Sequence, residues 1–186
     1  MTDERLITDD WIVDRILERE GRAVFSDRRD DAGGPTRWGI TQETLTAWRC
    51  RPVTALEVAA LTESEARQIY QHRYITAPGF YRVGNRRLRW LLADCGVLHG
   101  PTRAVRWLQS ALGVQIDGQL GWLTAGALWA ADWRVVFLAL CEQRINFIGE
   151  IVTGNVADQD RDGVPDNTEM CKGWLARATS FLEEAA

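Results

Sequence analysis

The sequence predicts a mainly helical protein with at most a small β-hairpin. Apolar residues recur every three or four positions through most of the chain, which is the spacing of helices that pack one face on a core. Residues that can cap helices precede many of these stretches, and the alternation typical of strands is nearly absent. With 186 residues, 46% of them hydrophobic, the chain can bury a sizeable core.

Five helices are expected in the first half of the chain, each with a start or stop signal. The first follows Thr8 and ends at about Glu20, because Gly21 breaks it. The next ones are expected from Thr41 to before Pro52, from a capping box at 54–57, from Thr62 to the break at 78–79, and over 88–97.

The second half is expected to hold four more helices. Thr102 is predicted to cap an amphipathic helix that reaches Gly113, and Asp117-Gly118 indicates a turn or at most a short strand pair. A short helix is expected over 124–131 and two longer ones over 132–152 and 168–184. The last of these is predicted to bury Trp174, Leu175, Phe181 and Leu182.

Composition and charge argue against several classes of protein. The net charge of −4 and the pI of about 5.3 argue against a nucleic-acid partner, although Lys172 is the only lysine among 22 basic residues. The acidic N-terminus has no apolar run, and no window reaches the roughly 18 apolar residues of a membrane span. We therefore expect no signal peptide, no stable membrane insertion and a monomer.

The four cysteines and nine tryptophans are expected to serve mainly the core. The cysteines are scattered without a C-x-x-C spacing, so a zinc site or redox pair is not expected and they are interpreted as reduced core residues: Cys50, Cys95, Cys141 and Cys171. Indole rings serve both cores and carbohydrate contacts, and we assign most of them to the core.

The stretch from Glu18 to Thr41 has the residue types of a catalytic site. Glu20 closes an apolar helical stripe, where partial shielding from water disfavours its charged form, as a general acid requires. Hydrolysis of a glycosidic bond needs a second carboxylate or a positioned water, and the candidates are Asp27, Asp30, Asp31 and the hydroxyl of Thr36. Gly33 and Gly34 allow a bulky ligand to approach the backbone, and Trp38 offers an apolar wall.

The run EGRAVFSDRRDDAGGPTRWGIT resembles the signature of the glycoside hydrolase 108 family, phage endolysins and related N-acetylmuramidases that cut peptidoglycan. In this resemblance Glu20 falls on the catalytic general acid, and Asp31, the glycines at 33–34 and Thr36 fall on other motif positions. Arg22 replaces the second glycine of the motif, and one extra residue precedes the glycines, so Asp30 competes with Asp31 for the aspartate position. The family implies a lysozyme-like helical muramidase fold and no cofactor for the chemistry.

The resemblance continues along the chain. The helix RQIYQHRY resembles the family's helix that ends in R-Y, with Tyr74 as either a sugar contact or a core residue, and DCGVLHGP at 94–101 resembles D-x-x-V-N-x-G-P. The D-G-x-x-G-x-x-T pattern at 117–124 and GWLAR at 173–177 resemble the peptidoglycan-binding module often paired with this family. We predict a catalytic region at 1–92 and a peptidoglycan-binding-like region at 93–186, packed as one compact unit.

A separate acidic loop predicts a Ca²⁺ site. Residues 158–169, DQDRDGVPDNTE, fit the EF-hand pattern D-x-D-x-D-G-x₅-E and lie between two expected helices, although Pro165 makes the loop more similar to those of thrombospondin type 3 repeats. The predicted Ca²⁺ ligands are Asp158, Asp160, Asp162, the backbone carbonyl of Val164, Asp166 and Glu169. The alternative interpretation is a solvated acidic loop without a bound ion.

The leading functional hypothesis is a phage or prophage endolysin that hydrolyses the β-1,4 bond between N-acetylmuramic acid and N-acetylglucosamine. Such an enzyme would be made in the host cytoplasm and would reach the cell wall through a holin-type pore. The alternatives are a lytic transglycosylase, which forms a 1,6-anhydro sugar, and a non-catalytic peptidoglycan-binding or structural module. An arginine-rich nucleic-acid binder is a more distant alternative.

Overall fold

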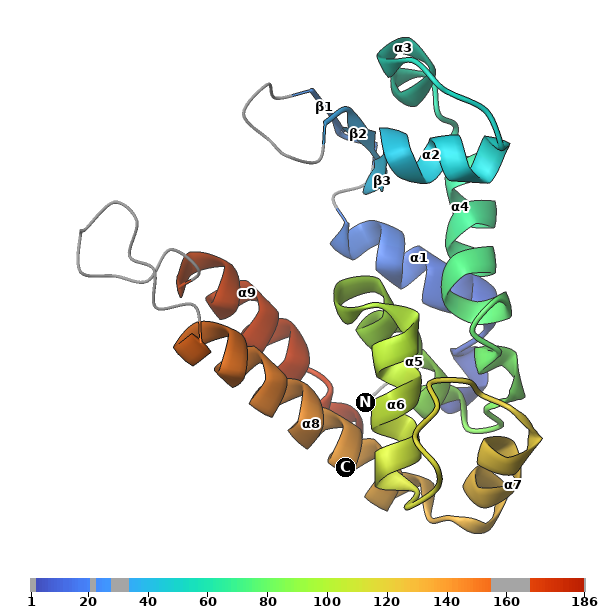
Figure 1. The fold of residues 1–186 in the computed structure, drawn as a ribbon, viewed down its shortest axis with the longest axis vertical. Helices are drawn as coiled ribbons and strands as arrows, with labels where there is room; N and C mark the ends of the chain where they lie inside the picture. Colours follow the sequence, from blue (N-terminus) through green and yellow to red (C-terminus); the bar gives the residue numbers. More distant parts are fainter. Residues whose placement is uncertain (1–2, 21–22, 28–33, 155–167, 186) are drawn as a thin grey trace.

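The computed structural model describes residues 3–20, 23–27, 34–154 and 168–185 (Figure 1). Its described part is mainly helical with one small antiparallel sheet, as the sequence predicts. The elements of the first half are η1 (Glu4–Leu6), α1 (Asp9–Arg19), β1 (Phe25–Ser26), β2 (Thr36–Arg37), β3 (Ile40–Thr41), α2 (Gln42–Arg49), α3 (Ala55–Ala59), α4 (Glu63–Gln71), η2 (His72–Thr76) and η3 (Phe80–Arg82). Those of the second half are α5 (Arg86–His99), α6 (Pro101–Ala111), α7 (Trp122–Ala130), α8 (Trp133–Gly154), α9 (Thr168–Thr179) and α10 (Leu182–Ala185).

The threonine capping signals are confirmed in the first half of the chain. The side chains of Thr8, Thr41 and Thr62 each accept a hydrogen bond from the backbone N–H three residues later. Thr54 and Glu57 form the full capping box of α3, in which each side chain accepts from the backbone N–H of the other residue. Four helices therefore begin where the sequence predicts.

Helix boundaries in the second half differ in three places. α6 begins at Pro101 and not after Thr102, because proline at the first helical position has a suitable φ and lacks an N–H that needs a partner. α7 begins at Trp122, with Gly121 as its extended N-cap residue. The last expected helix is divided into α9 and α10 by a turn at 180–181.

Some of the predicted core assignments are wrong. The turn at 180–181 buries Phe181 but directs Leu182 outward, and Leu175 lies outside the buried face of α9, which runs through Cys171 and Ala178. Cys50 is exposed because it ends α2 as a left-handed C-cap residue, whereas the other three cysteines are buried. Two of the nine tryptophans, Trp122 and Trp129, are 81% and 91% exposed on α7.

The sheet has one strand more than the expected hairpin. β2 pairs with β1 and with β3, both antiparallel, and each strand is two residues long. Thr36 lies in the central strand opposite Ser26 on one side and Thr41 on the other. The sheet stands beside α2 and close to the C-terminal end of α1 (Figure 1).

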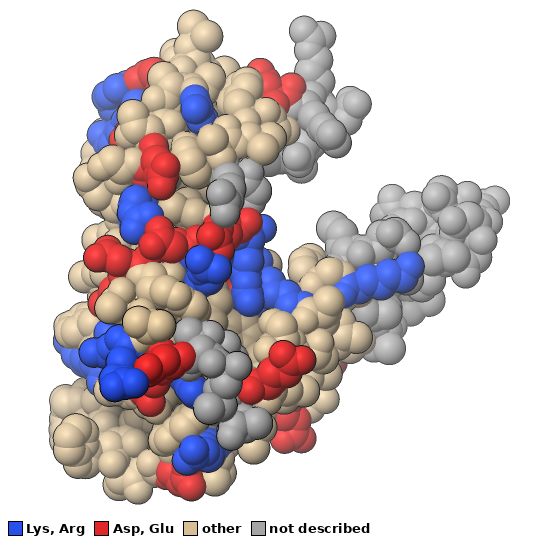
Figure 2. Space-filling model, turned by 180° about the vertical axis from the view of Figure 1, so that it is seen from behind, with Lys and Arg blue, Asp and Glu red and all other residues tan. Residues whose placement is uncertain are grey.

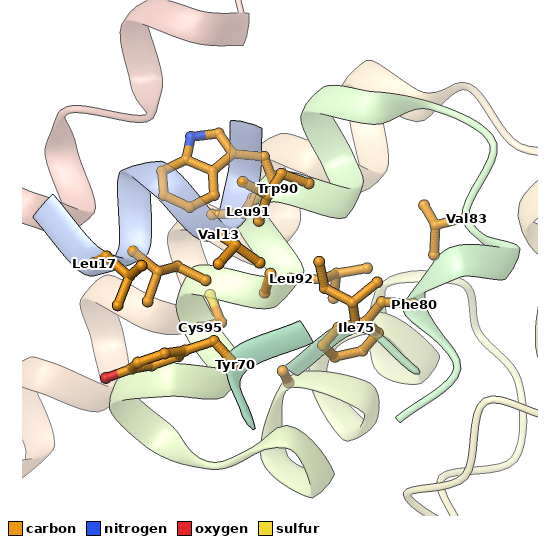
Figure 3. Close-up of a cluster of buried hydrophobic side chains, with 14 of the residues drawn as sticks. Val13, Leu17, Tyr70, Ile75, Phe80, Val83, Trp90, Leu91, Leu92 and Cys95 are labelled. Atoms are coloured by element: carbon orange, nitrogen blue, oxygen red, sulfur yellow. The ribbon is translucent and has the colours of Figure 1, made fainter. Parts of the chain in front are cut away.

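One continuous core joins the two halves of the chain. In the first half, Val13 and Leu17 of α1 face Leu91, Leu92 and Cys95 of α5 (Figure 3). Aromatic rings extend this core into the C-terminal region. The ring centroids of Trp90 and Phe181 lie 5.3 Å apart, and those of Phe137 and Phe181 lie 6.5 Å apart. The 92/93 boundary stays a prediction, and it falls inside α5, which packs against α1, α6 and α8.

The C-terminal helices form an antiparallel pair. α8 and α9 pack side by side and extend away from the central helices α5 and α6 (Figure 1). These two helices flank the predicted calcium loop, most of which lies outside the described residues.

No single helix in the described ranges is long and apolar enough to span a membrane. Helix α7 together with Trp133–Ile151 of α8 passes that test of length and composition as a pair, but the pair is bent by 117°.

Candidate active site

Glu20 lies at the C-terminal end of α1, directly over the buried core. The helix packs through Ile12, Val13, Ile16 and Leu17, and Glu20 follows Ile16 by four residues, so both lie on the same face. Its backbone N–H still donates to the Ile16 carbonyl, which fixes the backbone at this position. The Glu20 side chain is 23% exposed, so the carboxyl is half-shielded, as the sequence predicts.

The turn between β2 and β3 lies against Glu20 because of a glycine. Gly39 has a φ of +71°, and a Cβ atom at this position would lie 2.5 Å from Tyr70 Oη and 2.8 Å from Glu20 Cβ. Both distances are too short for a side chain, so only glycine allows the turn to approach α1 and α4 this closely. Trp38, one residue earlier, also has a left-handed φ of 56°.

Two tyrosines line the same place from α4 and η2. The hydroxyl of Tyr70 donates to the Trp38 carbonyl at 2.9 Å, and the rings of Tyr70 and Tyr74 lie 5.6 Å apart. Burial raises the pKa of both phenols, and the negative charge of Glu20 raises it further. Both hydroxyls therefore stay protonated at neutral pH and can act as hydrogen-bond donors.

Arg177 brings the C-terminal region into contact with Glu20. Its Nη1 atom donates to Glu20 Oε1 at 2.9 Å, across 157 residues of sequence. Nε of the same guanidinium donates to Asp94 Oδ1 at 2.9 Å, and Nη2 lies 2.8 Å from that oxygen. One planar group therefore bridges two carboxylates, which fixes its orientation.

Asp94 is the centre of a buried charge cluster. Its side chain is 0% exposed, and Arg19 Nη1 donates to its Oδ1 at 2.7 Å, while Arg144 Nη2 lies 2.8 Å from its Oδ2. Burial alone would raise the pKa of Asp94, but Arg177 and Arg144 outweigh it and hold the pKa below its usual value. The cluster connects α1, α5, α8 and α9, so the position of Arg177 depends on all four helices.

The structure brings together part of the predicted site. Glu20, Trp38 and Tyr74 gather as expected, and Tyr74 is half-buried and packed against the core. Thr36 lies in β2, where its hydroxyl donates to the carbonyl of Gly34 at 3.1 Å. Asp30, Asp31, Gly33 and the calcium-loop positions Asp158, Asp160, Asp162, Val164 and Asp166 lie outside the described residues, and nothing is described of the Glu169 side chain.

Four residues of this site are not predicted as functional from the sequence. Tyr70, Gly39, Asp94 and Arg177 occur there only within longer motifs. The sequence does carry signals for three of them. The glycine in W-G-I-T indicates a possible left-handed backbone. The charged residues inside D-x-x-V and G-W-L-x-R indicate an ion pair, because a charge within an apolar motif needs a partner.

One face of the molecule is hollowed. Figure 2 shows a hollow between the arm formed by α8 and α9 and the part of the molecule that carries the sheet, with acidic and basic side chains adjacent at its base. A separate groove of about 1030 Å³ lies between η2 and α7, lined by Arg73, Arg82 and Trp122. No carboxylate lines that groove, so the described part of it offers no acid for bond cleavage.

Two family models match the chain in sequence. Residues 13–100 match glycosyl hydrolase 108, and residues 103–179 match a family described as predicted peptidoglycan domain. Residues 13–100 thus form a glycosyl hydrolase 108 domain. Together the two matches show a peptidoglycan hydrolase, which is a glycoside hydrolase with a peptidoglycan-binding C-terminal domain.

The fold of this glycosyl hydrolase 108 protein is similar to that of a solved structure. SagA of Brucella abortus superposes with a TM-score of 0.76 and 28% sequence identity, over 95% of this chain and 92% of that one. A search of curated proteins gave no match. The mainly α, lysozyme-like fold expected from the sequence is thereby confirmed over nearly the whole chain.

The described residues contain no metal centre. No group of three or more histidine, cysteine, aspartate or glutamate side chains in the described ranges could hold a metal ion.

Proposed function

We propose that this hydrolase cleaves the β-1,4 bond between N-acetylmuramic acid and N-acetylglucosamine, with Glu20 as the general acid. The observation that carries the proposal is the half-shielded Glu20 carboxyl, which lies next to the Gly39 turn and close to two protonated phenols. An acid in this position can donate a proton to the oxygen of the leaving sugar. Trp38 and Tyr74 offer flat faces for sugar rings.

The other half of the reaction needs a group on the opposite side of the sugar. We assign this role to Asp31, or to Asp30, together with Thr36, which would hold the attacking water or stabilise positive charge at the sugar. Thr36 lies in the central strand of the sheet, at the end of the run that carries both aspartates. Gly33 and Gly34 let the substrate approach this backbone.

The activity is tested with purified peptidoglycan and two variants. Wild type is expected to release muropeptides, and Glu20→Gln is expected to lose at least about 100-fold in rate, because the amide has no proton of suitable acidity to give. Glu18→Gln is the matched control, since Glu18 pairs with Arg15 on the same helix.

Mass spectrometry of the products decides the type of reaction. Reducing N-acetylmuramic acid ends support hydrolysis at the proposed bond, whereas 1,6-anhydro ends would identify a lytic transglycosylase. Retained binding to peptidoglycan without release by either protein would identify a non-catalytic module and contradict the proposal.

We further propose that the enzyme acts as a phage or prophage endolysin, because the signature at Glu20 to Thr41 resembles that group. The enzyme would be made in the host cytoplasm and would reach peptidoglycan through a holin-type pore. Cytoplasmic expression in a Gram-negative host is expected to cause lysis only when a holin is co-expressed. Lysis at the same rate without a pore would contradict this route.

We also propose that the loop at 158–169 binds Ca²⁺ and stabilises the α8–α9 pair. Five carboxylates within twelve residues of sequence support this proposal, since they repel one another without a cation. Calcium at 100 times its Kd would add about 2.7 kcal/mol to the free energy of unfolding. Millimolar calcium is expected to raise the Tm above that in EGTA, and the rise should disappear in Asp160→Asn. An equal Tm in both buffers would contradict calcium binding.

A further inference from the structure

We infer that Arg177, which lies in the peptidoglycan domain, is a positioning residue of the hydrolytic site: it orients the Glu20 carboxyl. The inference rests on the proposed role of Glu20 as the acid. It assigns to the C-terminal domain a part in the chemistry itself, in addition to binding peptidoglycan.

The geometry supports an orienting role. Nη1 of Arg177 holds Glu20 Oε1, while Nε and Nη2 hold Asp94 Oδ1 on the other side of the guanidinium. Arg177 is itself only 14% exposed, so solvent competes weakly for these bonds. With Oε1 held, we assign the proton transfer to Oε2. Lysine at 177 would keep the charge but could not hold both carboxylates in one plane.

The charges around Glu20 support the same role. The described cluster holds three arginines, Arg19, Arg144 and Arg177, against the carboxylates of Asp94 and Glu20. Of these three arginines, Arg177 contacts both carboxylates. It therefore ties the direction of the Glu20 carboxyl to the buried Asp94.

The experiment compares Arg177→Met and Arg177→Lys with wild type. Arg177→Met is expected to lower kcat at least about 10-fold with a KM close to that of wild type, because the Glu20 carboxyl loses its orientation while the sugar-binding surface stays. Arg177→Lys is also expected to lower kcat, because lysine keeps the charge but cannot hold both carboxylates in one plane. Arg49→Met is the matched control, because it loses a similar pair, with Glu65, that does not involve Glu20, and its kcat should equal that of wild type.

A second measurement is independent of activity. Carbon-13 NMR of labelled glutamate follows the Glu20 carboxyl directly, with Glu20→Gln identifying its signal. At a single pH this signal is expected to move in Arg177→Met and in Arg177→Lys relative to wild type and to stay in place in Arg49→Met, and thermal unfolding confirms that each variant is folded. If Arg177→Met does not fold, Arg177→Lys decides: a lower kcat with a KM near that of wild type supports the inference.

The outcomes separate this inference from the proposed function. Equal kcat values and equal Glu20 signals in wild type and Arg177→Met would overturn the inference, even if Glu20→Gln is inactive. Retained kcat in Arg177→Lys would overturn it as well. If wild type itself releases no muropeptide, the proposed function fails, while the NMR signal still decides whether Arg177 orients the Glu20 carboxyl.

Discussion

Replacing Asp94 by asparagine changes the buried charge cluster without changing its shape. Asparagine has nearly the same size as aspartate, so the core around α5 keeps its packing. The substitution leaves Arg19, Arg144 and Arg177 without the anion that they share. Arg144 suffers most, because it is 0% exposed and its Nε and Nη1 atoms have no hydrogen-bond partner among the described residues.

The expected cost follows from that burial. Removing one partner of a fully buried ion pair lowers the free energy of unfolding by about 3–5 kcal/mol, because an uncompensated charge remains in the core. The pair of Asp14 with Arg67 is a matched control on the surface, where Asp14 is 47% exposed. Asp14→Asn is therefore expected to cost at most about 1 kcal/mol.

The pH dependence of the free energy of unfolding is an independent test of the Asp94 charge cluster. The arginines around Asp94 hold its pKa in the folded protein below its usual value. Its contribution is thus present above about pH 4 and is lost as the pH falls through the depressed folded value. Asp94→Asn is expected to lack this acid-dependent part, so its stability should fall less steeply than that of wild type in that range.

Urea unfolding followed by circular dichroism measures these differences. The reasoning is refuted if Asp94→Asn is within about 1 kcal/mol of wild type, or if its loss equals that of Asp14→Asn. The double variant Asp94→Asn with Arg144→Met tests the cause. Removal of the unpaired buried cation is expected to recover part of the loss, and a further drop of similar size would contradict the electrostatic explanation.

Three other substitutions have definite expected outcomes. Gly39→Ala is expected to cost at least about 2 kcal/mol and to reduce muropeptide release, because φ is +71° and its Cβ would meet Tyr70 and Glu20; normal Tm and activity would contradict this. Tyr70→Phe should cost about 1–2 kcal/mol in urea unfolding by leaving the Trp38 carbonyl without its donor, and no loss would show that another donor replaces it. His99 has its pKa lowered to about 4 by burial and by Arg144 and Arg103, so wild type should lose up to about 3 kcal/mol as the pH falls from 6.5 to 4. His99→Phe should lack this loss, and an unchanged pH profile of the Tm would count against the assignment.

Local signals in the sequence predict most of the helices but not the way in which distant residues meet. Thr8, Thr41 and Thr54 specify helix starts because a cap acts within three residues of its position. Glu20 could be selected because it ends an apolar stripe. Arg177 could not be placed next to it, because this contact spans 157 residues and depends on the docking of α9.

The same limit applies to the tyrosines and to the C-terminal helix. Tyr70 and Tyr74 lie on one helical face, and the sequence gives no reason to prefer one of them for the site. The structure separates them through the left-handed backbone at 38–39, which directs the Trp38 carbonyl to the Tyr70 hydroxyl. The exposure of Leu175 and Leu182 depends on the turn at 180–181, for which the sequence carries no glycine or proline signal.

The two family matches end at residue 100 and begin at residue 103, yet the charge cluster crosses this division. Asp94 and Glu20 lie in the first match, and Arg144 and Arg177 lie in the second. The Glu20 carboxyl is therefore paired with a residue from the domain named for binding. Arg177 follows the start of α9 by nine residues, or about 14 Å of helix. A cation in the loop before α9 would hold this helix against α8, so calcium would act on the position of Arg177 as well as on the Tm. The proposed calcium effect and the proposed role of Arg177 thus predict the same coupling: EGTA should lower the activity of wild type more than that of Arg177→Met.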